Sequence, residues 1–228
     1  SDVCSSDLRV VGVDLGMKVP AYVSLNDIHY IGKPIGDGDE FHRLSTKLKE
    51  QRRQMNKRLK FTAGGKGRKK KLKAKEYLKN KQANFRKHYQ EVLSKDVIKF
   101  ALENQAGIIH MEKLDSESFK KKIKNKKDED RVNSMIAEWG YYQIQQMIER
   151  KAKVEGIVVR YVDPAYTSQT CSRCGNLEKE QRDKRKFTCK KCGFSIHADR
   201  NASQNIAKST KIEEKEIKQD AKKEGKQG

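Results

Sequence analysis

Four of the five cysteines lie in two short motifs, "CSRCG" at 171–175 and "CKKCG" at 189–193. In each motif two thiolates stand three positions apart, and the following glycine lets the backbone turn around an ion. A redox CxxC motif is the alternative, but such a motif does not occur as a matched pair. The motifs therefore predict a closed, structural Zn²⁺ site whose metal supplies folding energy. Its four ligands would be Cys171, Cys174, Cys189 and Cys192.

Three acidic residues stand where predicted elements end or begin. Asp14 ends the apolar run in "GVDLG", Glu112 ends the run "GIIHME", and Asp199 begins the helical segment "ADRNASQNIA". Ordinary alternatives exist, because acids at strand ends are often turn formers and Asp199 could be a helix N-cap. However, Asp199 shares one helix face with Ala202 and Ile206, and we expect that face to pack against the sheet.

Together the three carboxylates predict a divalent-cation site. Two neighbouring strands and one packed helix can bring them to a single point, where they would repel each other without a cation. Mg²⁺ suits such a site, because it is a hard ion that takes few carboxylates and keeps waters for phosphate oxygens.

The charge of the chain predicts a polyanionic partner. The sequence has 228 residues with 52 Lys and Arg against 31 Asp and Glu, a net charge of +21. Residues 47–87 alone hold 18 Lys and Arg and two Glu, within two helical stretches separated by "AGGKG". A solvated surface helix is the simpler interpretation, but the scarcity of acids favours contact with a nucleic-acid backbone. The candidate contacts are Lys47, Arg52, Arg53, Lys57, Arg58, Arg68, Lys69, Lys70 and Lys73.

The order of predicted elements indicates an α/β fold. Strands are expected at 9–14, 21–25 and 28–32, the last two joined by a tight turn at Asn26-Asp27. Two long helices, a strand at 107–112, a helix at 132–154 and a strand at 156–162 follow. This order matches a mixed sheet of the ribonuclease-H-like kind, with a basic helical hairpin and an inserted four-cysteine zinc ribbon.

The combination "GVDLG…ME…CxxCG…CxxCG…HADRNAS" resembles the RuvC-like nuclease domain of TnpB proteins and of the miniature type V CRISPR effectors. The resemblance covers 9–208, and "DPAYTSQTCSRCG" and "DRNAS" are its most specific parts. It implies an RNA-guided, Mg²⁺-dependent DNA endonuclease with a DNA target and a guide RNA. The implied catalytic residues are Asp14, Glu112 and Asp199, which would hold two Mg²⁺ ions, and Arg200, which would contact the scissile phosphate.

The resemblance also implies a division of the chain. Residues 9–166 and 194–208 would form the RuvC-like domain, 167–193 the zinc ribbon, and 209–228 a charged, disordered tail. Residues 1–8, "SDVCSSDL", resemble a translated sequencing adapter, so we expect a non-native extension in which Cys4 has no role. The family carries an N-terminal recognition region before GVDLG, so we expect this catalytic half to be weak or inactive alone. With no transmembrane run or signal peptide, the predicted location is the prokaryotic cytoplasm.

Other interpretations stay open. The chain could be a catalytically silent nucleic-acid-binding module or a transposon accessory protein, although all three acids stand. A strand-joining transposase would need a recognisable tyrosine or histidine nucleophile, and a zinc-ribbon protein of transcription or translation would leave "GVDLG" and "DRNAS" unexplained. Trp139, Tyr141 and Tyr142 could stack on bases, but packing against the sheet is the preferred interpretation, at least for Trp139.

Overall fold

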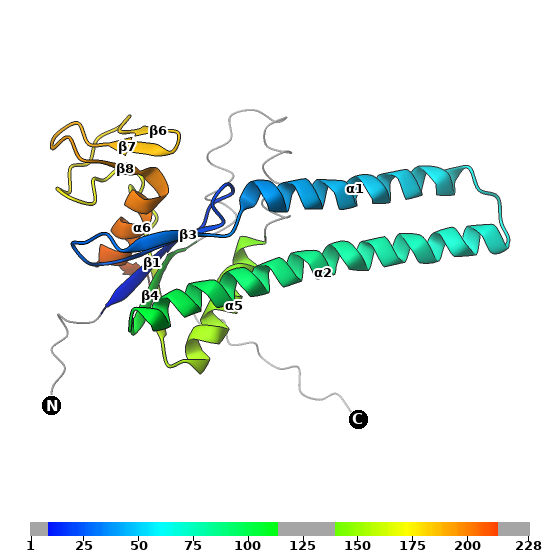
Figure 1. Cartoon of the computed structure of the whole chain (residues 1–228), viewed down its shortest axis with the longest axis horizontal. Helices are drawn as coiled ribbons and strands as arrows, with labels where there is room; N and C mark the ends of the chain where they lie inside the picture. The colour runs from blue at the N-terminus through cyan, green and yellow to red at the C-terminus, as the bar shows by residue number, and fades with distance from the viewer. Residues whose placement is uncertain (1–8, 114–139, 214–228) are drawn as a thin grey trace, which may run out of the picture.

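The computed structural model describes residues 9–113 and 140–213 (Figure 1). A six-stranded mixed sheet has the order β3-β2-β1-β4-β5-β9, and a three-stranded sheet has the order β6-β7-β8. The strands of the large sheet are β1 (Val10–Asp14), β2 (Ala21–Leu25), β3 (Gly32–Ile35), β4 (Ile108–Glu112), β5 (Val158–Val162) and β9 (Ile212–Glu213). The small sheet contains β6 (Arg182–Asp183), β7 (Lys186–Thr188) and β8 (Ser195–His197). The helices are α1 (Gly38–Lys60), α2 (Lys66–Glu103), α5 (Tyr141–Val154) and α6 (Ala198–Lys208).

The large sheet is mixed, as predicted. β1 pairs antiparallel with β2 and parallel with β4, and β4 pairs parallel with β5. The expected α/β fold of the ribonuclease-H-like kind is therefore confirmed. β9 was not predicted: Ile212 pairs with Val162 on the open edge of β5, so the expected disordered tail is wrong for the start of that segment.

Two sequence boundaries also differ from the structure. The turn after β2 is longer than the predicted Asn26-Asp27 turn: the Leu25 amide donates to the Ile31 carbonyl at 2.9 Å, and β3 begins at Gly32. Asn26 Oδ1 accepts a hydrogen bond from the Val10 amide at 3.0 Å. β8 extends the ribbon sheet beyond the predicted boundary at Gly193 to His197.

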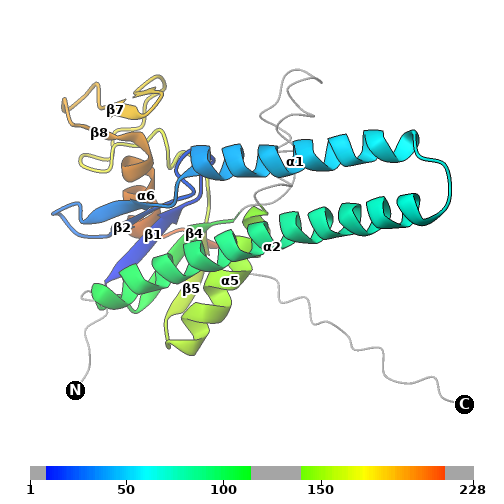
Figure 2. The same cartoon turned by 45° about the vertical axis from the view of Figure 1, so that its right-hand side comes forward.

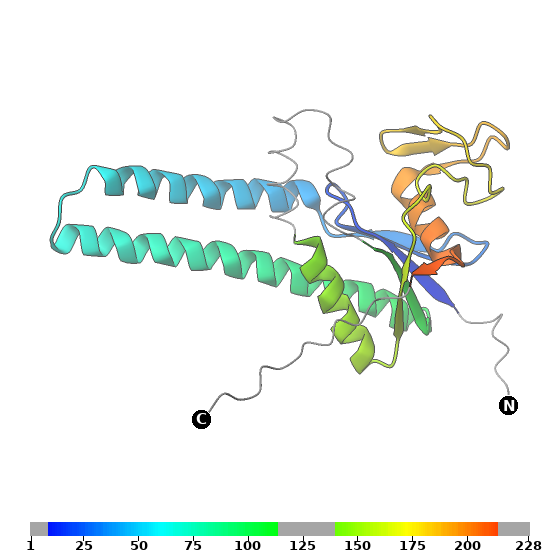
Figure 3. The same cartoon turned by 180° about the vertical axis from the view of Figure 1, so that it is seen from behind.

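Helices cover opposite faces of the large sheet, as Figures 1 and 3 show. On one face Val11, Val13, Ile109 and Met111 join a core with residues of α2 and α5. On the other face α6 lies directly against β1. A Cβ at Gly12 would stand 2.1 Å from the Ser203 carbonyl oxygen and 2.4 Å from the Ala207 amide nitrogen. Glycine at this position therefore allows α6 to approach the sheet closely.

α1 and α2 form a long antiparallel hairpin that projects from the sheet (Figure 2). Its base is fixed by Tyr89, whose hydroxyl donates to the Asp37 carbonyl at 2.8 Å and accepts from the Asp37 amide at 3.0 Å. Asp37 is also the N-cap of α1, because its side chain accepts from the amides of Asp39 and Glu40. Burial raises the pKa of Tyr89 to about 12, so the hydroxyl stays neutral. The predicted helical stretches are confirmed.

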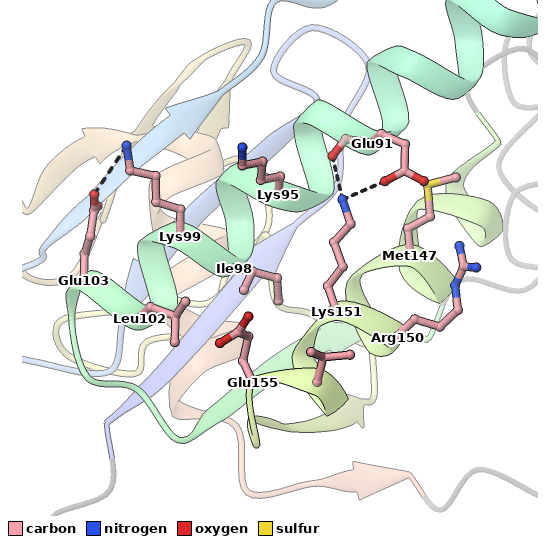
Figure 4. Close-up of a pocket in the computed structure, with 11 residues that line it drawn as sticks. Glu91, Lys95, Ile98, Lys99, Leu102, Glu103, Met147, Arg150, Lys151 and Glu155 are labelled. Carbon is pink, nitrogen blue, oxygen red and sulfur yellow. Dashed lines mark hydrogen bonds and ion pairs between the residues drawn. The ribbon is translucent and has the colours of Figure 1, made fainter.

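A pocket of about 690 Å³ lies between α2 and α5 (Figure 4). Ile98, Leu102 and Met147 are among its apolar lining residues. Lys151 of α5 connects the two helices next to the pocket, because its ammonium contacts the Glu91 carboxylate and the Glu91 carbonyl, each at 2.8 Å.

None of the helices in the described residues combines the length and the apolar composition of a membrane-spanning segment.

Candidate metal centres and nucleic-acid interface

The cysteine cluster is built from two knuckles of the same geometry. In each, the glycine amide donates to the carbonyl of the first cysteine: Gly175 to Cys171 at 2.9 Å, and Gly193 to Cys189 at 3.0 Å. Both glycines have a φ near +70°, the left-handed region that favours glycine. The glycines after each CxxC therefore make the turns that the sequence predicted.

The four sulfurs form a group that can hold a metal ion. Their ligand atoms all lie within 4.8 Å of one another, with 3.8 Å between Cys171 and Cys192 and 3.6 Å between Cys174 and Cys189. A tetrahedral zinc ion with Zn–S bonds of about 2.3 Å would separate its sulfurs by about 3.8 Å. The observed spacing therefore fits a four-thiolate zinc site.

Strand register places two of the three carboxylates side by side. Val13 pairs with Met111, so Asp14 and Glu112 end neighbouring parallel strands at the same level. Val11 and Val13 face α2 and α5, and so do Ile109 and Met111, so strand alternation puts both acids on the α6 face. Adjacent strands are about 4.8 Å apart, a separation that two carboxylates can bridge through one cation.

The surroundings of Glu112 fix its position. Its Oε1 accepts a hydrogen bond from the Thr167 hydroxyl at 2.5 Å, and its carbonyl accepts from Gln145 Nε2 at 2.7 Å. Thr167 is held in turn by Asn205 of α6, which donates to the Thr167 carbonyl at 2.8 Å. The end of β4, the segment after β5 and helix α6 therefore meet at this carboxylate.

Asp199 lies in the first turn of α6, but it is not the N-cap. That position belongs to His197, whose Nδ1 accepts from the Asp199 amide at 3.3 Å, so the N-cap alternative is wrong. Burial is the main cause of the raised pKa of Tyr22. The charge of Arg200 lowers this pKa, and the Asp199 carboxylate raises it. Because Tyr22 pairs with Asp14 across β1 and β2, Asp199 stands near the end of β1 that carries Asp14.

Asp199 is engaged by a ribbon residue in this structure. Its Oδ1 lies 2.9 Å from an Nη atom of Arg182 in β6. Among the described residues, one group of at least three potential metal-ligand side chains has its ligand atoms within 4.8 Å of one another, and this group is the four cysteines. The three carboxylates are not drawn together that tightly, although Asp14 and Glu112 have the oxygen donors and register that a hard cation needs.

Arg200 is bonded to the backbone of the sheet. Its guanidinium donates to the Tyr30 carbonyl between β2 and β3. The structure therefore gives Arg200 a contact that ties α6 to the sheet.

Sequence reasoning missed the polar side chains that lock α6 in place. Ser203 is buried and shares a hydrogen bond of 2.6 Å with Ser24, and the Gln204 amide donates to the Leu25 carbonyl at 2.6 Å. Asn201, also buried, accepts from the Ser172 amide at 2.9 Å and so joins the helix to the first cysteine knuckle. Polar residues clustered on a helix expected to pack were the signal that could have found them.

The basic hairpin offers an exposed cationic surface. Of the nine predicted contacts, Arg52 is the half-buried one, and it donates to buried Gln82 across the hairpin at 2.5 Å. Arg68 is exposed and donates to the Leu59 and Thr62 carbonyls at the hairpin tip. These two arginines therefore hold the two helices together. The other seven predicted contacts are all exposed.

The aromatic residues at the start of α5 divide between two environments. Tyr141 is buried in the core, which agrees with packing, whereas the Tyr142 side chain is exposed. Trp139, the charged stretch 118–130 and the predicted helix start at 132 lie outside the described residues, as does Cys4.

The fold and these sites together define a ribonuclease-H-like, RuvC-type domain that carries a zinc-ribbon-like module. Residues 141–206 match the family described as "Cas12f1-like, TNB domain". The chain is 33% identical over 203 residues to the CRISPR-associated endodeoxyribonuclease Cas12f1 of Sulfoacidibacillus thermotolerans, covering 87% of this chain and 45% of that protein. It is 29% identical to the putative RNA-guided DNA endonuclease InsQ of Escherichia coli K12, covering 86% and 48%.

Solved structures give the same result. A cryo-EM structure of a Cas12f ternary complex matches with a TM-score of 0.71 and 32% identity, covering 94% of this chain and 41% of that one. A Cas12f1 complex with sgRNA and target DNA matches with a TM-score of 0.67 and 29% identity, covering 91% and 51%. The resemblance to the TnpB and miniature type V effector family is thereby confirmed, and the chain corresponds to the C-terminal part of those proteins. The chain spans less than half the length of the Sulfoacidibacillus thermotolerans and Escherichia coli relatives.

Proposed function

We propose that the chain is the metal-dependent nuclease part of an RNA-guided DNA endonuclease of the Cas12f and TnpB type. The observation that carries this proposal is the register of β1 and β4, which sets Asp14 and Glu112 at one level on the face that α6 covers. The relatives described above support it, since they are named as a CRISPR-associated endodeoxyribonuclease and a putative RNA-guided DNA endonuclease.

Within this proposal Asp14, Glu112 and Asp199 would hold two Mg²⁺ ions. Bound Mg²⁺ supplies a lowered pKa for the attacking water and charge stabilisation at the phosphate. The protein's own work is positioning: Thr167 holds the Glu112 carboxylate, and α6 presents Asp199. In this structure Arg182 is bonded to Asp199, and its charge opposes metal binding by that carboxylate. Arg200, which contacts the Tyr30 carbonyl in this structure, would contact the scissile phosphate when DNA is bound.

The four cysteines would hold structural Zn²⁺. The ribbon turn Lys184-Arg185 lies at the start of α6, where the Arg185 carbonyl accepts a hydrogen bond from the Ala198 amide at 2.7 Å. The exposed cations of α1 and α2 contact the backbone of a guide RNA–target DNA duplex without reading its sequence. The partners are therefore guide RNA and target DNA. The division into a RuvC-like domain, zinc ribbon and tail is also proposed, with the ribbon extended to His197.

The test is guided DNA cleavage by the complete product of the gene that carries this chain. Asp14→Asn and Glu112→Gln should each reduce cleavage to background while nucleic-acid affinity and zinc content stay unchanged. Asp27→Asn is the matched control, because Asp27 accepts a hydrogen bond in the loop between β2 and β3, and it should cleave like the wild type. Full cleavage by the Asp14 or Glu112 variant would overturn the assignment of these carboxylates. No cleavage by the wild type would support the alternative, a catalytically silent nucleic-acid-binding module or transposon accessory protein.

A further inference from the structure

A basic pocket of about 370 Å³ opens beside Asp199. Its walls come from the loop after β1 and from the β6–β7 hairpin of the ribbon. Asp199 is the acidic residue among the lining side chains. The cationic ones are Lys18, Arg182, Lys184 and Arg185.

Arg182 is held in this pocket from two directions. An Nη atom bonds Asp199 Oδ1 at 2.9 Å, and its Nε donates to the Lys184 carbonyl at 3.0 Å. The Arg182 side chain is 41% exposed and that of Asp199 is 19% exposed. The guanidinium is therefore the more accessible partner of the pair, and an anion that enters the pocket can contact it.

The ion pair conflicts with metal binding by Asp199. The guanidinium lies 2.9 Å from Asp199 Oδ1, so it takes up one of the lone pairs of that oxygen and places a positive charge beside the carboxylate. The neighbouring lysines and arginines further oppose an approaching divalent cation. A guanidinium binds phosphate at least as readily as carboxylate, so a nucleic-acid backbone can take Arg182 and offset the positive field.

We propose that Arg182 is a removable counter-ion of Asp199, and that a phosphodiester backbone entering the pocket draws it away, so the third metal ligand becomes available when a strand is bound. This inference rests on the proposed function. It makes metal binding and strand binding mutually dependent, because a coupling free energy acts equally on both ligands. The ribbon would then control metal occupancy in addition to contacting the strand.

The first experiment measures Mn²⁺ affinity by calorimetry on the zinc-loaded chain without nucleic acid. Arg182→Gln should bind Mn²⁺ at least about tenfold more tightly than the wild type, within the range usual for coupled sites. Arg185→Gln is the matched control, because it removes the same charge from the same pocket but leaves the Arg182–Asp199 pair in place. Equal gains in the two variants, or no gain in Arg182→Gln, would overturn the proposal.

The second experiment measures the affinity of a fluorescent oligothymidylate by anisotropy at constant ionic strength. Mn²⁺ should tighten strand binding by the wild type and have a smaller effect on Arg182→Gln. Equal effects on the two proteins would overturn the inference while leaving the nuclease proposal intact. If no protein binds Mn²⁺, the proposed function fails as well, so the two failures can be told apart.

Discussion

At the scale of single residues, the cysteine ligands already lie at metal-binding distances, whereas the three carboxylates are not gathered as closely. Each knuckle closes through its own glycine turn, so the ligands are set by local sequence. Asp14, Glu112 and Asp199 depend on strand register and on the docking of α6, and Asp199 is also bonded to Arg182. Local motifs therefore predicted the grouping of the four sulfurs, whereas the three acids, a proposed metal site, depend on contacts between distant parts of the chain.

Replacing a buried cysteine should unfold the ribbon. Cys189→Ser removes one of four thiolates, and the small apolar cluster of Cys171, Phe187, Cys189 and Ala198 is too small to stabilise the module without metal. We expect zinc content measured by atomic absorption to fall from about one ion per chain to nearly zero. Cys4→Ser is the control and should keep its zinc. Retention of a full equivalent by Cys189→Ser would contradict the four-thiolate assignment.

At the scale of elements, the close approach of α6 to β1 is the feature that brings Asp199 to the sheet. Gly12 makes this approach possible, and Asn201, Ser203 and Gln204 satisfy the buried polar groups along it. The sequence predicted which face of α6 packs, because Ala202 and Ile206 are buried as expected. It could not predict the hydrogen-bond partners, which lie far away in the chain.

Gly12→Ala should destabilise the fold, because the new Cβ meets backbone atoms of α6 that no side-chain rotation can move. We expect the free energy of unfolding in urea to fall by about 2–3 kcal/mol. Gly67→Ala is the control: nothing lies within 4 Å of the added Cβ in α2, so alanine should be neutral or stabilising by up to about 1 kcal/mol. Equal effects of the two substitutions would show that α6 does not pack as described.

His110 makes the same interface sensitive to acid. It is buried on β4, its Nδ1 lies 3.1 Å from the Ile206 carbonyl, and burial lowers its pKa. The unfolded chain, with a histidine pKa of about 6.5, takes up a proton that the folded chain resists. This contribution to stability is therefore present above about pH 6.5 and is lost as the pH falls below it, by up to about 1.4 kcal/mol per pH unit.

The measurement is urea unfolding at several pH values between 7.5 and 5.5 for the wild type and His110→Gln. Since thiolate ligands also protonate in acid, the quantity to compare is the difference between the two proteins at each pH. The wild type should lose more stability than the variant. If stability falls equally with pH in the wild type and His110→Gln, His110 is not held neutral. His88→Gln, at an exposed position on α2, is the control and should follow the wild type.

At the scale of the whole molecule, the chain separates its charges by region. The hairpin carries most of the excess cations away from the sheet, whereas the candidate nuclease site and the ribbon lie at the other end (Figures 1 and 3). Composition and periodicity predicted this hairpin and the central strands. They did not predict β9, a two-residue strand in a mixed-charge segment, or the Arg182–Asp199 pair, which joins the ribbon to α6.

Removing exposed lysines of the hairpin should change the salt dependence of nucleic-acid binding. For Lys69→Gln, Lys70→Gln and Lys73→Gln combined, we expect the slope of log K against log salt to fall by about 1 for each lysine that contacts a phosphate. Binding of an RNA–DNA duplex by anisotropy at several salt concentrations measures the slope. Lys99→Gln is the control, because Lys99 pairs with Glu103 at the sheet end of α2. An unchanged slope in the triple variant would place the duplex elsewhere.

The most direct test of the carboxylate site is a crystal structure of the chain soaked in Mn²⁺ with a short DNA strand. Anomalous scattering locates metal ions without reference to activity, and zinc at the four cysteines provides an internal positive control. We predict manganese peaks bound by Asp14, Glu112 and Asp199, with Arg182 turned to the strand. Zinc density at the cysteines with no manganese at the carboxylates, and with Arg182 still bonded to Asp199, would contradict the account.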